Sequence, residues 1–259
     1  MIPYFQFPSL QLGPFTLQSF GVFAAAGVAL AAWLLVREAK RAGLDSAPVR
    51  EIPIWAMVGG LFGGHFMHLF LYHPEELHGS AGAWQIFKIW DGLSSTGGAL
   101  GGTLAVLLWF KTHHRRFADY ADAFALSVAS GWTIARLGCF SVHDHPGSLT
   151  TFPLAVAFPG GPRHDLGLYD ALLLGAISAL LFSLSRAHRL QGRLLPVLAL
   201  LYGTGRFWLD FLRASDLPYS DARYHGLTPA QYVCIALVAY GGAALARIGR
   251  ASTPLRATG

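Results

Sequence analysis

Seven apolar runs, most of them long enough to cross a lipid bilayer, dominate this sequence. A transmembrane helix needs about 20 mostly apolar residues, with a range of roughly 17–25. The runs cover residues 15–36, 54–72, 97–110, 119–140, 168–186, 194–213 and 229–247. Only 13% of the residues are charged, about half the fraction that is usual in soluble domains. The sequence therefore predicts an all-α polytopic membrane protein with about seven transmembrane helices, forming a single domain over residues 1–259.

The third run is short and follows a glycine-rich stretch, DGLSSTGGALGG, at residues 91–102. Irregular backbone is tolerated at membrane depth only where protein or a water-filled cavity covers it. We therefore expect a half-buried segment before the third helix, and we treat it as part of a candidate pocket.

Basic residues alternate between the segments that separate the runs. The first 14 residues carry no Lys or Arg. When Arg186 and Arg247, the last residues of their runs, are counted with the segments that follow them, the later segments alternate between three or four basic residues and a single one. By the positive-inside rule this pattern predicts an outer N-terminus, a cytoplasmic C-terminus and seven crossings. Because the basic residues form short clusters and no stripe, we expect no nucleic-acid partner. The N-terminus has no basic stretch and no A-x-A site, so we expect no cleaved signal peptide.

Polar outliers gather at the predicted outer ends of the helices. The stretch RLGCFSVHDHPG, residues 136–147, ends the fourth run, and RHDLGLYD, residues 163–170, begins the fifth. Arg206 and Asp210 are spaced i, i+4 on the sixth, so both can face one cavity. Ionisable groups in or near a bilayer are costly and are functional by default. Alternatively, Arg206 and Asp210 form a structural ion pair and Arg136 only reaches toward the interface.

Two arginines that converge on an outer cavity suit a phosphate group. A guanidinium offers a planar fork of donors that pairs with two phosphate oxygens. Nearby glycines let backbone N–H groups approach a headgroup closely, although small residues also serve helix packing in membranes. We favour the packing role for Gly101 and Gly102 and the headgroup role for Gly97 and Gly98.

Five motifs, taken together in order and spacing, resemble those of the prolipoprotein diacylglyceryl transferases, which are bacterial seven-span inner-membrane enzymes. In chain order they are IWDGLSSTGGALGG (89–102), ARLGCFSVHDHPG (135–147), PRHDLGLYDALL (162–173), YGTGRFWLDFLRASD (202–216) and LTPAQ (227–231). The second, for example, is similar to the family signature Gly-Arg-x-Gly-Asn-Phe-x-Asn-x-Glu-x-x-Gly. The resemblance runs nearly end to end.

The resemblance implies transfer of a diacylglyceryl group from phosphatidylglycerol, or another anionic phospholipid, to the thiol of a lipobox cysteine in an exported precursor. Glycerol phosphate is released, no metal or cofactor is needed, and the active site faces the outside of the cytoplasmic (inner) membrane. Arg136 would bind the headgroup and Arg206 would be the second essential arginine. Family positions are also matched by Asp144, Gly147, Tyr169, Tyr202 and Asp210.

The chain departs from the family pattern at several positions. Thr96 occupies the place of the His proposed as the catalytic base, Cys139 that of the signature Asn, and Asp165 that of a Pro. Because threonine cannot accept a proton at neutral pH, we hypothesise that the base has moved to a group of nearby histidines. This histidine group comprises His143, His145 and His164.

Other interpretations stay open on the sequence alone. Cys139 and the histidine group offer ligand types that suit zinc, although their spacing matches no standard motif. The same lipid donor could serve a different acceptor, because the departures surround the reacting centre. The chain could also be a catalytically inactive, lipid-binding paralogue. A transporter with an anion site at mid-membrane is the fourth alternative, but transporters usually show two related halves with broken helices, and no repeat is apparent here.

Overall fold

The computed structural model describes residues 1–5, 7, 9–12, 15–72, 77, 82–89, 92–217 and 223–251. The chain divides into two compact units, of which the first holds Met1–Glu38 and Ala121–Gly259 and the second Ala39–Tyr120. This division does not test the predicted single functional domain, which stays a prediction.

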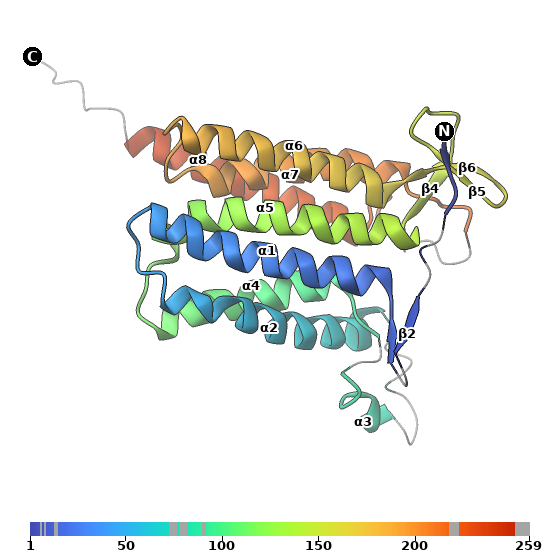
Figure 1. The fold of residues 1–259 in the computed structure, drawn as a ribbon, viewed down its shortest axis with the longest axis horizontal. Coiled ribbons are helices and arrows are strands. Elements are labelled where there is room, and N and C mark those ends of the chain that lie inside the picture. Colours follow the sequence, from blue (N-terminus) through green and yellow to red (C-terminus); the bar gives the residue numbers. More distant parts are fainter. Residues whose placement is uncertain are drawn as a thin grey trace, which may run out of the picture. The chain divides into compact units, whose positions relative to one another are not determined.

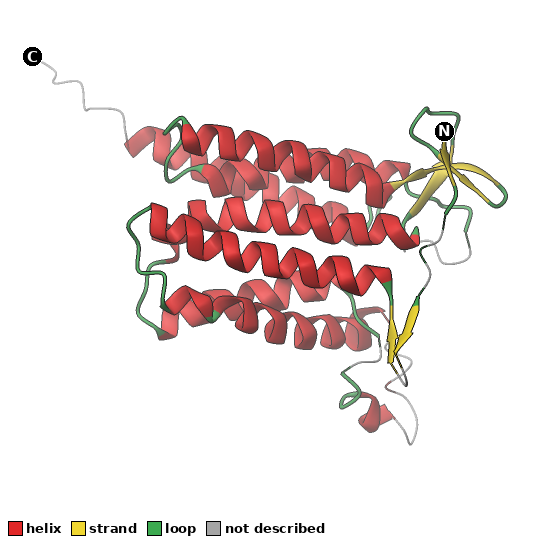
Figure 2. Ribbon diagram, in the orientation of Figure 1, coloured by secondary structure: helices red, strands yellow, loops and turns green. Residues whose placement is uncertain are grey.

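Helices occupy all seven predicted segments (Figures 1 and 2). They are α1 Ser19–Arg41, α2 Ile52–Met67, α4 Ser95–Thr112, α5 Phe117–Val142, α6 Leu166–Arg186, α7 Leu194–Leu209 and α8 Pro229–Ala251. Short helical turns add η1 Pro48–Arg50, the π-helical η2 His68–Tyr72, α3 Gly82–Gln85 and η4 Asp210–Leu212. The predicted boundaries agree with these helices to within a few residues, except that residues 15–17 form a strand and residues 210–212 a 3-10 turn.

Four helices in the described part of the chain are long and apolar enough to cross a membrane, namely α1, α5, α6 and α8. The helices α2 and α7 have 16 residues each. At 1.5 Å per residue they span roughly 24 Å, which is less than the hydrocarbon thickness of about 30 Å. Large apolar side chains nevertheless point outward on several helices, as Trp33, Leu104 and Trp208 do. Such exposure is costly in water and is expected where lipid surrounds the helices.

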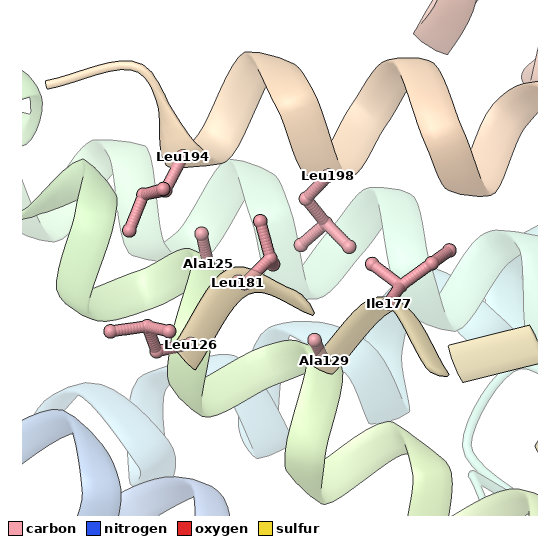
Figure 3. Packing of buried hydrophobic residues seen from close by; sticks show 7 residues of the cluster. All are labelled: Ala125, Leu126, Ala129, Ile177, Leu181, Leu194 and Leu198. Carbon is pink, nitrogen blue, oxygen red and sulfur yellow. The ribbon is translucent and has the colours of Figure 1, made fainter. Parts of the chain in front are cut away.

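The core of the first unit joins α5, α6 and α7 (Figure 3). It consists of small and branched apolar side chains that are almost completely buried: Ala125, Leu126, Ala129, Ile177, Leu181, Leu194 and Leu198. Two carboxylate contacts lock the start of α7, because Asp122 on α5 accepts hydrogen bonds from the backbone N–H groups of Gly192 and Leu194. These contacts fix the relative positions of the helices that carry the polar residues described below.

A small sheet forms part of the first unit and was not predicted. Its strand order is β1-β5-β6-β4, with β1 Ile2–Pro3, β5 Val156–Phe158, β6 Gly161–Asp165 and β4 Pro146–Leu149. A separate hairpin pairs β2 Leu10–Leu12 with β3 Phe15–Leu17. The strands have two to five residues, too few for an alternating apolar pattern to reveal them. The expectation of an all-α chain is therefore wrong in this detail, although the structure is mostly helical.

In the second unit, α2 and α4 pack closely through glycines. A Cβ atom on Gly97 would lie 2.4 Å from the carbonyl oxygen of Gly63, and one on Gly101 would lie 2.2 Å from that of Gly59. Only glycine allows so close an approach of two helices. Gly98 has only an ordinary contact, 3.5 Å from the carbonyl oxygen of Gly60. Packing is thus the observed environment of Gly97 as well as Gly101, whereas a headgroup contact remains a prediction for Gly98.

Most of the glycine-rich segment is helical, contrary to the expectation of a half-buried loop. Ser94 caps α4 by accepting a hydrogen bond from the backbone N–H of Gly97, so only residues 92–94 of the described part of that segment precede the helix. The preceding backbone is held by His65 on α2, whose ring nitrogens contact the carbonyl oxygens of Gln85 and Gly92 at 3.0 and 3.3 Å. The side chain of Thr96 lies outside the described residues.

Candidate active site

Two arginines from different helices meet at one carboxylate. Nε of Arg136 on α5 lies 2.8 Å from Oδ2 of Asp170, and Nε of Arg206 on α7 lies 3.4 Å from the same oxygen. The side chain of Asp170 is 1% exposed and that of Arg206 is 6% exposed. The convergence of Arg136 and Arg206 on one place, which the sequence predicted, is confirmed. The carboxylate that joins them belongs to Asp170 on α6.

Close packing of α5 against α6 brings Asp170 to this position. A Cβ atom on Gly167, at the start of α6, would lie 2.7 Å from the backbone nitrogen of Phe140 on α5. Because glycine has no Cβ, the two backbones can touch here. Asp170 follows three residues later, nearly one helical turn, and thereby faces Arg136 one turn before Phe140.

A second carboxylate, Asp210, extends the network at the end of α7. Its Oδ1 lies 3.0 Å from Nη1 of Arg206, in the predicted i, i+4 pair, and accepts a hydrogen bond from Nε of Arg213 at 2.8 Å. Its Oδ2 accepts a hydrogen bond from the hydroxyl of Thr228, just before α8. The hydroxyl of Tyr202 donates to Asp170 at 3.4 Å. We call Arg136, Asp170, Tyr202, Arg206, Asp210 and Arg213 the arginine cluster.

In the arginine cluster, three guanidinium groups contact two carboxylates. Buried hydrogen-bonding capacity is also left over among the described residues. Oδ1 of Asp170 and Nη1 of Arg206 have no aligned hydrogen-bond partner, even though Nη1 is within ion-pair distance of Asp210. Buried polar groups are normally satisfied, so such groups call for an explanation. An anion with several acceptor oxygens would give Nη1 of Arg206 its missing partner, and a hydroxyl group on the same ligand would donate to Oδ1 of Asp170.

A thiol, a carboxylate and an imidazole adjoin the arginine cluster. Nη1 of Arg136 lies 3.5 Å from Sγ of Cys139, and the ligand-type atoms of Cys139, Asp144 and His145 lie within 4.8 Å of one another. Nδ1 of His145 is hydrogen-bonded to Asp144. Burial opposes protonation of His145, but its hydrogen bond with Asp144 and the nearby Cys139 outweigh this cost and raise its pKa above the usual value.

The same three residues have atom types that could hold a metal ion. The guanidinium of Arg136 beside the thiol repels a cation, and we assign no metal to the site. The zinc set considered from the sequence does not assemble, because His143 and His164 each face a different partner.

His143 is sealed among aromatic rings. Its Nδ1 lies 2.6 Å from Oδ2 of Asp165, and its ring lies within 5.4 Å, centroid to centroid, of those of Tyr4, Phe5 and Phe158. Oδ1 of Asp165 accepts a hydrogen bond from the backbone N–H of Leu168, which caps α6. Burial raises the pKa of Asp165, despite the opposing hydrogen bond with His143.

His164 takes a third environment. Its Nδ1 is hydrogen-bonded to the hydroxyl of Tyr169 at 2.9 Å, and that hydroxyl also lies 3.4 Å from the carbonyl oxygen of Leu154. Burial lowers the pKa of His164. The predicted site residue Tyr169 therefore belongs with His164 and is not part of the arginine cluster, whereas Tyr202 is.

Gly147 joins the sheet to the end of α7. A Cβ atom there would lie 2.5 Å from the carbonyl oxygen of Leu212 and 2.7 Å from Cβ of His164. Its own carbonyl oxygen accepts a hydrogen bond from Nη1 of Arg163 at 3.0 Å. Close backbone approach accounts for glycine at this position, where its backbone also forms an isolated β-bridge with that of Arg213. Its predicted role in binding substrate stays a prediction.

Sequence reasoning noticed Asp170 only as one of several polar outliers and gave it no role. It also gave no role to Arg213 or to Thr228. The sequence feature that could have revealed these residues is the position of acidic and basic residues near helix ends. Asp170 lies in the first turns of α6, and Arg206 and Asp210 lie at the end of α7. Adjacent antiparallel helices bring those ends to one side of the bundle.

Comparison with known proteins identifies the family of the chain. The family model described as prolipoprotein diacylglyceryl transferase matches residues 8–247. The chain belongs to the prolipoprotein diacylglyceryl transferase family. It is thus a membrane transferase, of a family of bacterial membrane enzymes.

Individual relatives match almost end to end. The chain is 31% identical over 238 residues to the phosphatidylglycerol–prolipoprotein diacylglyceryl transferase of Chromohalobacter salexigens, covering 90% of this chain and 88% of the relative. The protein of the same description from Nitratidesulfovibrio vulgaris is 30% identical over 240 residues, which cover 90% of each chain. The one from Xanthomonas oryzae pv. oryzae is 29% identical over 272 residues, covering 94% of this chain and 91% of the relative.

Proposed function

We propose that the chain transfers a diacylglyceryl group from phosphatidylglycerol to the thiol of a lipobox cysteine in an exported precursor protein. The convergence of Arg136 and Arg206 on Asp170 carries this proposal. The names of the relatives specify the same donor and the same class of acceptor. The reaction forms a carbon–sulfur bond, breaks the bond between the glyceryl carbon and a phosphate oxygen, and releases glycerol phosphate.

The arginine cluster suits the donor lipid for a physical reason. A phosphodiester carries a negative charge and acceptor oxygens, which suit the converging guanidinium groups of Arg136 and Arg206 and the unsatisfied Nη1 of Arg206. Arg136 and Arg206 would hold the phosphate oxygens and stabilise the negative charge that grows on them as glycerol phosphate leaves. Asp170 would keep the two guanidinium groups together before the lipid arrives, so that little reorganisation is needed when it binds.

The acceptor thiol must lose a proton before it attacks, because the thiolate is the nucleophile. The proposed proton acceptor is a member of the histidine group, and His145 is favoured. It interacts with Cys139, which contacts Arg136, and Asp144 holds its Nδ1. His143 and His164 have partners elsewhere.

We also propose that all seven helices cross the cytoplasmic membrane, with the N-terminus and the arginine cluster toward the outer face. Within the first unit, the cluster lies where α5 and α7 end and α6 and α8 begin. The loop at the other end of α6 and α7 carries Arg189 and Arg193. Basic loops are retained on the cytoplasmic side, which supports an outward-facing site.

One assay tests the reaction. The purified chain is incubated with phosphatidylglycerol labelled in its acyl chains and with a synthetic lipobox peptide that contains one cysteine. We expect lipidated peptide and an equal amount of glycerol phosphate. Lipid binding without either product would instead indicate a non-catalytic paralogue. Glycerol phosphate formed in repeated turnovers without lipidated peptide would indicate a different acceptor.

A further inference from the structure

A thiol already lies beside the proposed phosphate site. Cys139 follows Arg136 by three residues on α5, so the two side chains share one helix face, and Sγ lies 3.5 Å from Nη1 of Arg136. The residue is 6% exposed. The reaction of this family uses a thiol as acceptor, and here a thiol of the chain itself occupies the neighbourhood of the donor.

The neighbours of Cys139 are those that activate a cysteine nucleophile. His145 lies close to Cys139 and is hydrogen-bonded through Nδ1 to Asp144. The three ligand-type atoms lie within 4.8 Å of one another. A nucleophile, a base and a group that orients the base form the pattern seen in covalent catalysis.

A second observation points to a ligand at the same place. Nη1 of Arg206 and Oδ1 of Asp170 are buried without an aligned hydrogen-bond partner. Arg136 contacts both Asp170 and Cys139, so an anion held by the two arginines lies next to the thiol. The nucleophile, its base and the binding site of the leaving group are therefore contiguous.

We propose that Cys139 is an internal acceptor, which takes a diacylglyceryl group from bound phosphatidylglycerol when no exported precursor is present. This proposal rests on the proposed function. The Cys139 sulfur attacks the glyceryl carbon that bears the phosphate and forms a carbon–sulfur bond. The carbon–oxygen bond to the phosphate breaks, and glycerol phosphate leaves with the bonding electrons. The thiol proton passes to His145.

The product is a thioether on Cys139. The chemistry of a thioether limits the internal reaction to one diacylglyceryl group per chain. A thiolate bound to carbon is a poor leaving group, so a second thiol does not displace it. The internal reaction therefore stops after one event per chain, whereas transfer to a precursor repeats. The burial of Cys139 keeps water-soluble electrophiles away, while a lipid bound at Arg136 reaches the thiol from within the site.

The test uses the full-length chain and two parallel incubations with acyl-labelled phosphatidylglycerol, one with a synthetic lipobox peptide and one without. Without the peptide we expect label on the protein that approaches one equivalent per chain, with matching glycerol phosphate. Peptide mapping by mass spectrometry should place a diacylglyceryl mass on Cys139. This readout uses the unmodified protein and does not depend on any variant folding correctly.

Variants then identify the residues involved. Cys139→Ser should lose the adduct, and His145→Asn should slow its formation by about 100-fold, the usual effect of losing a general base. Cys234→Ser is the matched control, because Cys234 is a buried cysteine on α8, and it should retain both the adduct and peptide lipidation.

The outcomes separate the two proposals. Lipidated peptide with no adduct on Cys139 overturns the internal acceptor and leaves the proposed function intact. An adduct on Cys139 without lipidated peptide supports the internal acceptor and overturns the exported acceptor. A mass gain of one acyl chain only, or label that persists in Cys139→Ser, also overturns the internal acceptor. Neither product in either incubation overturns both.

Discussion

The arginine cluster and the histidine group contain residues of similar polarity in the same unit, yet they are built in opposite ways. Arg136, Asp170 and Arg206 are distant in sequence and come from three helices, but they share one carboxylate oxygen. His143 and His145 are two residues apart, but one is sealed among aromatic rings and the other is bound to Asp144 beside a thiol. Proximity in sequence therefore says less about a shared role than proximity at the ends of packed helices.

Charge explains the difference. A guanidinium stays charged, so its burial is costly unless a counter-charge lies beside it. One carboxylate can serve as the counter-charge of two guanidinium groups. An imidazole can be neutral and needs only one or two hydrogen-bond partners, which many local environments supply. Cations within a bundle are thus drawn together, whereas histidines are free to separate.

The largest expected effect comes from removing the carboxylate that unites the arginine cluster. Asp170→Asn leaves two buried guanidinium groups facing each other, and we expect it to lower the free energy of unfolding by about 3–5 kcal/mol. Denaturant unfolding in detergent measures the change, and Asp170→Glu should restore much of it. Unchanged stability and unchanged transfer in Asp170→Asn would show that the arginines do not depend on this residue.

Substitution of the arginines tests whether their convergence matters for the reaction. Arg136→Ala should reduce the rate of transfer by about 100- to 1000-fold, because it removes a donor to the charge that develops on the phosphate. Arg206→Lys should also reduce the rate, since an ammonium group lacks the planar fork of a guanidinium. Arg189→Ala, in the exposed loop between α6 and α7, is the control and should retain full activity. Full activity in Arg136→Ala would contradict the proposed site.

Alanine substitutions separate the members of the histidine group. His145→Ala should reduce the rate by about 100-fold with little change in stability, as expected for a general base. His143→Ala should instead lower the free energy of unfolding by about 1–3 kcal/mol, because it leaves the buried Asp165 without its partner. His164→Ala should change the transfer rate less than His145→Ala does, and the free energy of unfolding less than His143→Ala does. Unchanged turnover in all three variants would end the hypothesis that the base moved to this group.

The pH dependence of the transfer rate further distinguishes His145 from the other two histidines. A base must be unprotonated to work, so the transfer rate should rise with pH, with a midpoint above the usual histidine value of about 6.5 because the pKa of His145 is raised. The stability that His145 gains from its hydrogen bonds is present below that usual value and is lost as pH rises through the raised pKa. A pH–rate profile of the wild type and of His145→Ala checks this, and the rising limb should be absent in the variant.

The smallest effect is expected at a partly exposed ion pair of the same unit, in which Arg163 is buried and Asp216 faces solvent. Nη1 of Arg163 donates to Oδ1 of Asp216 at 3.0 Å, but the side chain of Asp216 is half exposed. Pairs exposed to solvent contribute little to stability. Asp216→Asn should leave the thermal midpoint and the transfer rate unchanged within error. A loss of activity comparable to that of Arg136→Ala would extend the functional site to this loop.

Much of the fold could be predicted because a long apolar run is stable in a membrane as an α-helix, in which the backbone hydrogen bonds are formed within the helix itself. The pair of Arg206 and Asp210 followed from helical spacing alone. The shared role of Asp170 could not be predicted in this way, because it depends on how closely α5 and α6 pack at Gly167. The sheet was missed because its short strands are held by contacts between the N-terminus and residues 146–165.

Residues that depart from the family pattern were the hardest to interpret from sequence. Asp165 looked like the loss of a proline, yet its two oxygens hold the start of α6 and His143. Cys139 looked like the loss of an amide, yet its thiol contacts Arg136. In each case the side chain makes specific contacts, and only the three-dimensional arrangement reveals them.

The double role of Asp165 has a mechanical consequence. One oxygen of Asp165 is hydrogen-bonded to the first turn of α6, and the other is hydrogen-bonded to His143, the residue just after α5. The two helices therefore cannot slide lengthwise past each other without breaking one of these hydrogen bonds. Lengthening the chain between positions 150 and 161 should therefore be harmless to the register of Arg136 and Asp170, whereas inserting one residue between Asp165 and Leu168 should disengage it.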